Sequence, residues 1–211
     1  MASSIAPDWL KLRPVFAVTG TSGAGKGTLE RIVLARVPEL ELAVSATTRP
    51  RRLAEQHGRE YYFVSPEEFQ QLIDEGAFLE HIDLPWGARS GTLWSEIERI
   101  RSTGRAPVLD LETEGALRVQ ETVDGAVTIF VKAPTFAELE RRLRERATES
   151  GGEIEERLAL AREQLAQEGS FDHVIVNDDV DRAAAELERI VRAELGKVAA
   201  TMPAHDSPAH R

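Results

Sequence analysis

Apolar residues recur along the chain with two different periods, and stretches of the two kinds alternate. Short apolar runs, such as those at 15–18 and 107–111, predict buried strands, because a parallel sheet covered on both faces needs uninterrupted hydrophobic segments. Longer stretches between them have apolar residues three or four positions apart, which is the spacing of an amphipathic helix. The alternation predicts an α/β fold with a largely parallel sheet flanked by helices.

This pattern gives a specific set of elements for the core. The predicted strands cover residues 15–18, 42–45, 107–111, 126–131 and 173–176. The predicted helices cover about residues 27–37, 93–103, 112–122, 135–146, 153–168 and 179–195.

The segment 46–92 has a different pattern and is interpreted as an inserted small α+β domain. A short strand is predicted at 61–64. Directly after it, Ser65-Pro66-Glu67-Glu68 combines a capping box with proline at the first helical position, which predicts the start of a helix.

The domain boundaries follow from these elements and from the polar stretches between them. The core domain is expected to consist of residues 13–45 and 93–195. Within it, the polar stretch 148–152 (TESGG) indicates a hinge, and a lid is predicted over about 142–157. Residues 1–12 are expected to be flexible, and residues 196–211 to form a disordered tail.

The first predicted strand runs directly into a glycine-rich turn that ends in a lysine. This turn is Gly20-Thr21-Ser22-Gly23-Ala24-Gly25-Lys26, and a helix follows it. Strand, glycine-rich loop and helix in this order are typical of a phosphate-binding P-loop, in which backbone N–H groups and the positive helix end face one anion. Lys26 adds a cation at the β- and γ-phosphates. The sequence therefore predicts a site for a phosphate chain.

The position after the lysine differs from the usual motif and bears on the metal. Gly27 stands where a serine or threonine usually coordinates Mg²⁺, and Thr28 follows one residue later. The Gly-Lys-Gly-Thr ending resembles the P-loop of adenylate kinases, in which phosphate binding survives this change. We expect Mg²⁺ to accompany the nucleotide, with Thr28 and Asp110 as indirect ligands through water. Direct coordination by a hydroxyl is left open.

The composition excludes several classes of site and partner. The 211 residues include no cysteine and five scattered histidines, which excludes disulfides and argues against a zinc site. No apolar stretch approaches the roughly 20 residues of a membrane span, and the amino terminus lacks a secretory signal. We therefore expect a cytoplasmic protein with no membrane partner. The net charge of −10 argues against nucleic acid as a partner.

Arginines nevertheless gather in two groups within this acidic chain. The first group is Arg49, Arg51, Arg52 and Arg59, and the second is Arg141, Arg142, Arg144 and Arg146. Beside a P-loop, the two groups are interpreted as clamps for anionic substrates.

Further short motifs resemble those of guanylate kinases, in the same order, over about residues 14–195. They are 46–52 (ATTRPRR), 58–64 (GREYYFV), 78–80 (FLE), 108–112 (VLDLE) and 174–179 (VIVNDD). Each is weak alone, but together with the P-loop they are specific. The resemblance implies direct in-line transfer of a phosphoryl group from Mg²⁺-bound ATP to GMP or dGMP. It also implies that the insert binds GMP and that the lid closes over ATP.

The resemblance assigns roles to residues by their position in these motifs. The GMP phosphate is expected at Arg49, Arg52 and Tyr61, and the guanine at Ser45, Glu80 and Glu112, with Ser90 and Thr92 nearby. Lys26, Arg49, Arg142, Arg146 and Arg157 are the expected catalytic residues. The ATP site is expected to comprise Gly20, Thr21, Ser22, Gly23, Ala24, Gly25, Lys26, Gly27 and Thr28, with Asn177 near the adenine.

The base-reading role of Glu80 also follows from the chemistry of guanine. Guanine presents N1–H and N2–H₂ donors side by side, and one carboxylate can accept from both. Adenine lacks this pair of donors and would leave a partly buried carboxylate unpaired, at a cost of about 1–3 kcal/mol or more.

Two departures from the family pattern bear on the acceptor. Glu112 stands where the family usually has aspartate, so its carboxylate reaches one methylene further. Ser90 stands where the family has a tyrosine that contacts the GMP phosphate, in a loop that is one residue longer. Arg89 could replace that contact, but on an extended segment neighbouring side chains point to opposite faces, so we expect it to point away.

Two other functions are consistent with the sequence. Relatives of this fold phosphorylate ribose bisphosphate, and a modified nucleotide is a further acceptor for the same chemistry. Alternatively, the chain is a non-catalytic module that binds a partner at the position where guanylate kinases bind GMP. Lys26 and the second arginine group favour an enzyme over such a module. The oligomeric state is left open.

Overall fold

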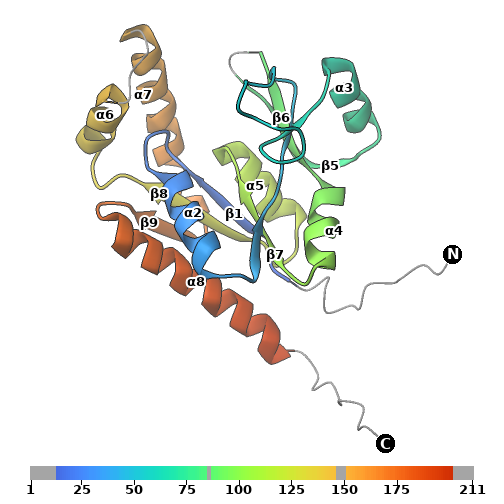
Figure 1. The fold of residues 1–211 in the computed structure, drawn as a ribbon. Coiled ribbons are helices and arrows are strands. Elements are labelled where there is room, and N and C mark those ends of the chain that lie inside the picture. Colours follow the sequence, from blue (N-terminus) through green and yellow to red (C-terminus); the bar gives the residue numbers. More distant parts are fainter. Residues whose placement is uncertain (1–12, 85–86, 146–150, 202–211) are drawn as a thin grey trace, which may run out of the picture.

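A five-stranded parallel sheet forms the centre of the molecule (Figure 1). The computed structural model describes residues 13–84, 87–145 and 151–201. The strand order is β2-β7-β1-β8-β9, and every neighbouring pair is parallel. The strands are β1 (Phe16–Gly20), β2 (Leu40–Leu42), β7 (Ala106–Asp110), β8 (Val127–Lys132) and β9 (His173–Val176).

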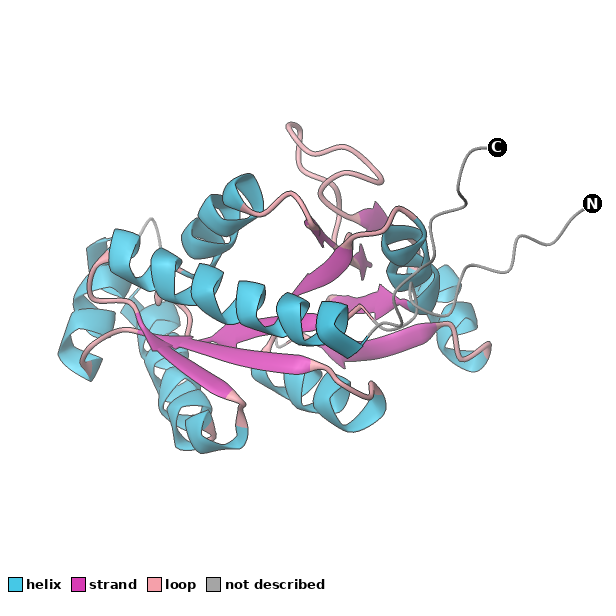
Figure 2. Ribbon diagram, turned by 90° about the horizontal axis from the view of Figure 1, so that it is seen from below, coloured by secondary structure: helices cyan, strands magenta, loops and turns pink. Residues whose placement is uncertain are grey.

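Helices cover both faces of this sheet, as Figure 2 shows. Successive residues of β1 belong to different hydrophobic clusters, because side chains alternate between the two faces of a strand. Phe16 and Val18 pack with α2 (Lys26–Arg36) and α8 (Val180–Thr201). Ala17 lies in the opposite cluster with α4 (Trp94–Ser102) and α5 (Thr113–Thr122). The uninterrupted apolar runs of the sequence thus become strands buried on both faces.

A second sheet is formed by residues of the segment predicted as an insert, 46–92, and extends to Leu93. Its strand order is β4-β3-β6-β5, and it mixes parallel and antiparallel pairs. The elements are β3 (Ala46–Thr47), β4 (Tyr62–Phe63), α3 (Pro66–Asp74), β5 (Phe78–Asp83) and β6 (Arg89–Leu93). Ala46, Phe69 and Phe78 form a small separate core here. The predicted capping box is confirmed, since Ser65 accepts from the N–H of Glu68 and Glu68 from that of Ser65.

Two further helices lie on the opposite side of the molecule from this second sheet (Figure 1). They are α6 (Phe136–Glu145) and α7 (Gly151–Ala166), and they share a small hydrophobic cluster that includes Leu139 and Leu158. A short 3₁₀ helix, Glu168–Ser170, follows α7. Of the hinge predicted at 148–152, residues 151 and 152 are helical, and the remainder lies outside the described residues.

The predicted α/β class is confirmed, and each predicted core helix is present, but three predictions of detail are wrong. Strand β2 covers Leu40–Leu42 rather than 42–45, because the chain turns there into the second sheet. Strands β3, β5 and β6 were not predicted. The tail is not irregular from 196, since α8 continues to Thr201 through alanines that favour a helix. Residues 1–12 and 202–211 lie outside the described residues.

None of the helices in the described part of the chain is long and apolar enough to cross a lipid bilayer.

Candidate active site

The loop between β1 and α2 has the geometry of an anion-binding turn. Gly23 and Gly25 have φ of 85° and 87°, a left-handed conformation that favours glycine. Gly25 is the N-cap of α2 and provides no side-chain cap, so the N–H groups of the first helical turn keep their capacity to bind an anion. A Cβ on Gly25 would lie 2.5 Å from Nδ2 of Asn177. Both the backbone angle and this contact therefore require glycine.

Lys26, the first residue of α2, reaches the carboxyl end of the neighbouring strand β7. Its Nζ donates to the backbone oxygen of Leu111 at 2.9 Å and forms an ion pair with the carboxylate of Asp110. Burial lowers the pKa of Lys26, but the negative charges of Asp110 and Glu30 outweigh that effect and the pKa is raised. Lys26 therefore keeps its positive charge at the end of the P-loop.

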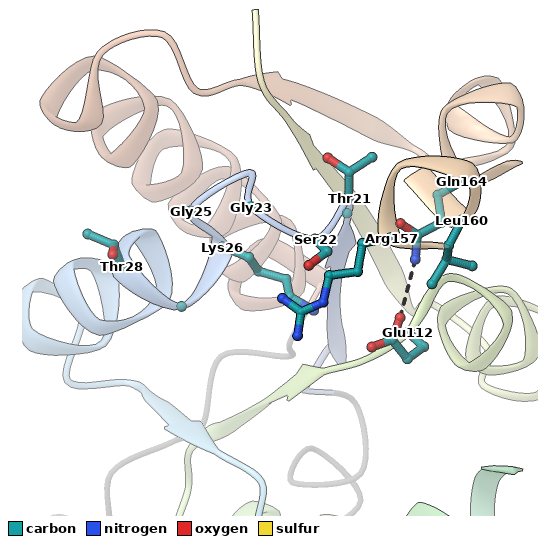
Figure 3. A pocket seen from close by; sticks show the side chains of 12 residues that line it. Thr21, Ser22, Gly23, Gly25, Lys26, Thr28, Glu112, Arg157, Leu160 and Gln164 are labelled. Atoms are coloured by element: carbon teal, nitrogen blue, oxygen red, sulfur yellow. Dashed lines mark hydrogen bonds between the residues drawn. The ribbon is translucent and has the colours of Figure 1, made fainter. Parts of the chain in front are cut away.

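A cavity of about 440 Å³ opens at the P-loop (Figure 3). All of the predicted P-loop residues except Ala24, which is buried, line it together with side chains from α7 and the start of α5. The lining residues are Gly20, Thr21, Ser22, Gly23, Gly25, Lys26, Gly27, Thr28, Glu112, Arg157, Leu160 and Gln164. Figure 3 shows Arg157 and Gln164 extending from α7 toward Lys26 and Glu112.

A second cavity, of about 250 Å³, lies between the core and the second sheet. Its lining brings together most of the residues predicted to read the acceptor. They are Ser45, Tyr61, Glu80, Ser90 and Glu112, with Lys26, Ile82, Leu84, Asp110 and Leu111 completing the wall. The two cavities share Lys26 and Glu112.

Glu80 lines the second cavity and is almost completely buried. Only 4% of the residue is exposed, and its Oε1 accepts a hydrogen bond from the N–H of Thr92 at 2.9 Å. Burial raises the pKa of Glu80, and the hydrogen bond from the N–H of Thr92 opposes this rise only in part. A Cβ on Gly115 would lie 2.9 Å from Oε2 of Glu80, so glycine at this position leaves room for the carboxylate. The cavity is thus lined by a buried acid with one oxygen already hydrogen-bonded.

The arginines predicted at the acceptor phosphate do not line this cavity. The guanidinium of Arg49 lies 5.3 Å from the ring centroid of Tyr61 and donates to Oε1 of Glu55 at 2.7 Å. Arg52 is exposed, and its backbone N–H donates to the other oxygen of Glu55. Thr92 is buried beneath the cavity and contributes its N–H to Glu80.

Asn177 and Arg142 lie close to the P-loop rather than on the cavity surface. The amide of Asn177, which is 2% exposed, donates to the backbone oxygen of Ala24 at 2.7 Å and so braces the loop. Arg142 donates to the backbone oxygen of Asn177 at 3.0 Å and to Glu138 at 2.8 Å. Arg146 lies outside the described residues.

Two members of the second arginine group, Arg141 and Arg144, are paired with acidic side chains, and the interpretation of this group as an anion clamp stays a prediction. Arg141 pairs with Glu138 and Glu145, and Arg144 pairs with Glu140 and Glu155. These pairs are exposed and mostly three or four residues apart, so they belong to the solvent face of α6.

Arg89 points away from the second cavity, as the strand alternation predicts. Its Nε donates to Oδ1 of Asp83 at 3.0 Å, and its Nη1 donates to Oε1 of Gln70 at 3.0 Å. The guanidinium also lies 5.3 Å from the ring centroid of Phe69. Ser90, the next residue, lines the cavity. Arg89 therefore does not line the second cavity, whereas Ser90 does.

Sequence reasoning missed several lining residues, above all Gln164 and Leu160 of α7. The available signal was helical spacing, because residues three, four and seven positions from Arg157 share its side of a helix. Ile82 lies in β5 and Leu84 directly follows the end of that strand, and both were missed because β5 was not predicted.

Comparisons with a family model, with curated proteins and with solved structures all identify the same family. A family model described as guanylate kinase matches residues 12–194. The chain is 44% identical over 174 residues to a guanylate kinase of Parasynechococcus marenigrum (strain WH8102), covering 82% of this chain and 95% of that protein. It is also 44% identical over 182 residues to one of Rubrobacter xylanophilus, covering 84% and 93%. Among solved structures, a guanylate kinase from Anaplasma phagocytophilum matches with a TM-score of 0.68 and 27% identity, over 87% of this chain and 86% of that one.

Proposed function

The chain belongs to the guanylate kinase family, and on that basis we propose that it transfers the γ-phosphoryl group of ATP to GMP or dGMP. The observation that carries this proposal is the position of Lys26, which lines both cavities. A cation shared by a P-loop cavity and an adjoining acceptor cavity lies where the transferred group must pass. We also propose that the reaction takes place in the cytoplasm.

On the donor side, the P-loop would hold the phosphates of ATP. Backbone N–H groups of the loop, the start of α2 and the ammonium of Lys26 together supply the positive potential. Lys26 would exchange its present partners, Asp110 and the backbone oxygen of Leu111, for phosphate oxygens. Arg157 adds a guanidinium that extends from α7 toward Lys26 (Figure 3).

The residues present fit a magnesium ion that arrives with ATP. The carboxylate of Asp110 is 48% exposed beside Lys26, and Thr28 lines the P-loop cavity. Carboxylate and hydroxyl oxygens suit Mg²⁺, which usually keeps several waters and binds substrate phosphates. Within residues 13–84, 87–145 and 151–201, no group of three or more histidine or acidic side chains is arranged to hold a metal by itself. Bound there, Mg²⁺ would offset charge on the phosphates.

On the acceptor side, Glu80 and Glu112 would accept from guanine N1–H and N2–H₂, and Ser45 would donate to O6. Tyr61, which lines the cavity beneath the guanidinium of Arg49, would contact the phosphate together with Arg49 and Arg52. Arg49 would then exchange the carboxylate of Glu55 for the phosphate of GMP.

Phosphoryl transfer needs little covalent chemistry from these side chains. The two substrates are brought into line, water is excluded, and cations offset the charge on the moving group. For this reason no general base is assigned.

The proposed activity is tested by measuring ADP release with ATP and a series of acceptors. We expect turnover with GMP and dGMP to exceed that with AMP, IMP and ribose bisphosphate. If ribose bisphosphate or another nucleotide is the better acceptor by kcat/KM, the fold is retained but the proposed substrate is wrong.

Replacing Glu80 with glutamine is expected to lower kcat/KM for GMP by about 10–100-fold, with little change in KM for ATP. The amide can keep the hydrogen bond from Thr92 through its oxygen, but its NH₂ then faces the guanine donors. The measurement is kcat/KM for GMP and for IMP, which lacks the N2 amino group. Glu114→Gln, an exposed acid of α5 paired with Arg118, is the matched control. An equal GMP-to-IMP ratio in Glu80→Gln and the unmodified enzyme removes Glu80 from the N2 contact.

Replacing Ser90 with tyrosine is expected to lower KM for GMP by about tenfold or more. A hydroxyl bound to a charged phosphate contributes about 1.5–3 kcal/mol, and serine is too short to reach the oxygen that the family's tyrosine contacts. Arg89→Ala is the companion variant, and it should leave KM for GMP nearly unchanged because Arg89 is bonded to Asp83 and Gln70. A large rise in KM for Arg89→Ala, with none of the expected gain in Ser90→Tyr, contradicts this account.

A further inference from the structure

The side chain of Glu112, at the start of α5, contacts a neighbouring helix rather than its own. It is the N-cap of α5, with φ of −70° and ψ of 159°, yet its side chain makes no capping hydrogen bond. Shorter side chains such as aspartate or serine at this position ordinarily accept from an N–H of the first helical turn, and the longer glutamate does not do so here. Its carboxylate instead accepts from Nε2 of Gln164 on α7, at 3.3 Å (Figure 3). The side chain is thus directed across the site, toward the neighbouring helix.

Gln164, the other partner in this hydrogen bond, is a buried polar residue. The residue is 5% exposed, and its Oε1 has no hydrogen-bond partner within the described part of the chain. A buried polar atom without a partner costs about 1–3 kcal/mol. Its helix neighbour Ala161 is fully buried, and an apolar side chain at 164 would extend that surface without the cost. The packing of α7 therefore does not explain the amide.

Through Gln164, helix α7 contacts a residue that lines both cavities. Gln164 follows Arg157 by seven residues, which places the two side chains on one side of α7. Both line the P-loop cavity, whereas Glu112 lines that cavity and the acceptor cavity as well. Helix α7 therefore approaches the donor site through Arg157 and the acceptor carboxylate through Gln164.

We propose that Gln164 is a positioning residue for Glu112 and thereby contributes to recognition of the acceptor base. Its Nε2 binds Oε2 of Glu112 and leaves Oε1 of that carboxylate for the guanine donors. The extra methylene of glutamate, compared with the family's aspartate, is what carries the carboxylate as far as α7. The inference rests on the proposed function and adds to it a residue of α7 that helps to set selectivity for the base.

The test is a double-mutant cycle between Gln164 and Glu112, read as KM for GMP, KM for ATP and the preference for GMP over IMP. Gln164→Leu should raise KM for GMP about tenfold and reduce the preference for GMP, while kcat and KM for ATP change less than twofold. Combined with Glu112→Ala, it should have no further effect on KM for GMP. Gln164→Glu keeps the shape and sets two carboxylates against each other, so it should raise KM for GMP at least as much.

The matched control is Gln167→Leu, because Gln167 is exposed just beyond the end of the same helix. It should change none of these values. An unchanged KM for GMP in both Gln164 variants, or effects of Gln164→Leu and Glu112→Ala that add, overturns the positioning role. Failure of the proposed function is visible separately, since the unmodified enzyme then prefers an acceptor other than GMP.

Discussion

Lys26→Met is expected to reduce kcat/KM for GMP by at least about 10³-fold, a loss of about 4 kcal/mol of transition-state stabilisation. Lys26 is the cation common to the two cavities, and methionine keeps an unbranched side chain, one atom shorter, without its charge. The melting temperature should change little, because the present partners of Lys26 are a half-exposed carboxylate and a backbone oxygen. The measurements are ADP release and thermal unfolding of the same preparation.

The control for Lys26→Met is Lys132→Met. Lys132 is also paired with an acid, Glu168, at 2.6 Å, and its side chain is similarly buried, but it lies outside both cavities. Loss of a surface ion pair contributes about 0–1 kcal/mol to stability, so this variant should remain active and folded. Near-normal turnover in Lys26→Met would refute phosphoryl transfer at the P-loop.

Glu30→Gln is expected to make the protein more stable near pH 8, because a charged carboxylate is then removed from a buried position. Glu30 lies one helical turn after Lys26 but is 5% exposed, and its Oε1 has no partner within the described residues. The surrounding side chains, Phe16, Val18 and Val33 among them, are apolar. Burial, aided by the negative charge of Asp110 and opposed by Lys26, raises the pKa of Glu30 to about 8.

The sign of the pH dependence follows from this raised pKa. Below about pH 4.5 Glu30 is protonated in both the folded and the unfolded chain, and it contributes no charge penalty. Between about 4.5 and 8 the unfolded chain loses the proton first, so the free energy of unfolding falls as the pH rises. The full penalty is present above pH 8, and the shift from 4.5 to about 8 sets its upper limit at about 5 kcal/mol.

The measurement is urea unfolding of the unmodified protein and Glu30→Gln from pH 4.5 to pH 8.5. The two proteins should be similarly stable at the acid end and diverge as the pH rises. Glu121→Gln, an exposed acid on α5, should reproduce the pH profile of the unmodified protein. Parallel profiles for the unmodified protein and Glu30→Gln would show that the carboxyl of Glu30 is not the source of the penalty.

The sequence by itself determined the parts of this protein that depend on neighbouring residues. The P-loop is a contiguous strand, loop and helix, and its glycines are required by backbone angles that local chemistry dictates. The capping box at Ser65 and Glu68 is local in the same way. Strand alternation alone sufficed to predict that Arg89 points away from the cavity that Ser90 lines.

Only the tertiary structure decided the features that depend on pairing between distant segments. Strand β5 (FLEHID) carries a buried glutamate, and β6 (RSGTL) is short of large apolar residues, so neither shows the alternation of a half-buried strand. Their pairing with each other and with β3 defines them. The contact between Gln164 and Glu112 joins residues 52 positions apart, and Glu30 is buried because α8 packs over α2. Such contacts are set by how helices and strands pack in three dimensions, which the periodicity of a single segment does not specify.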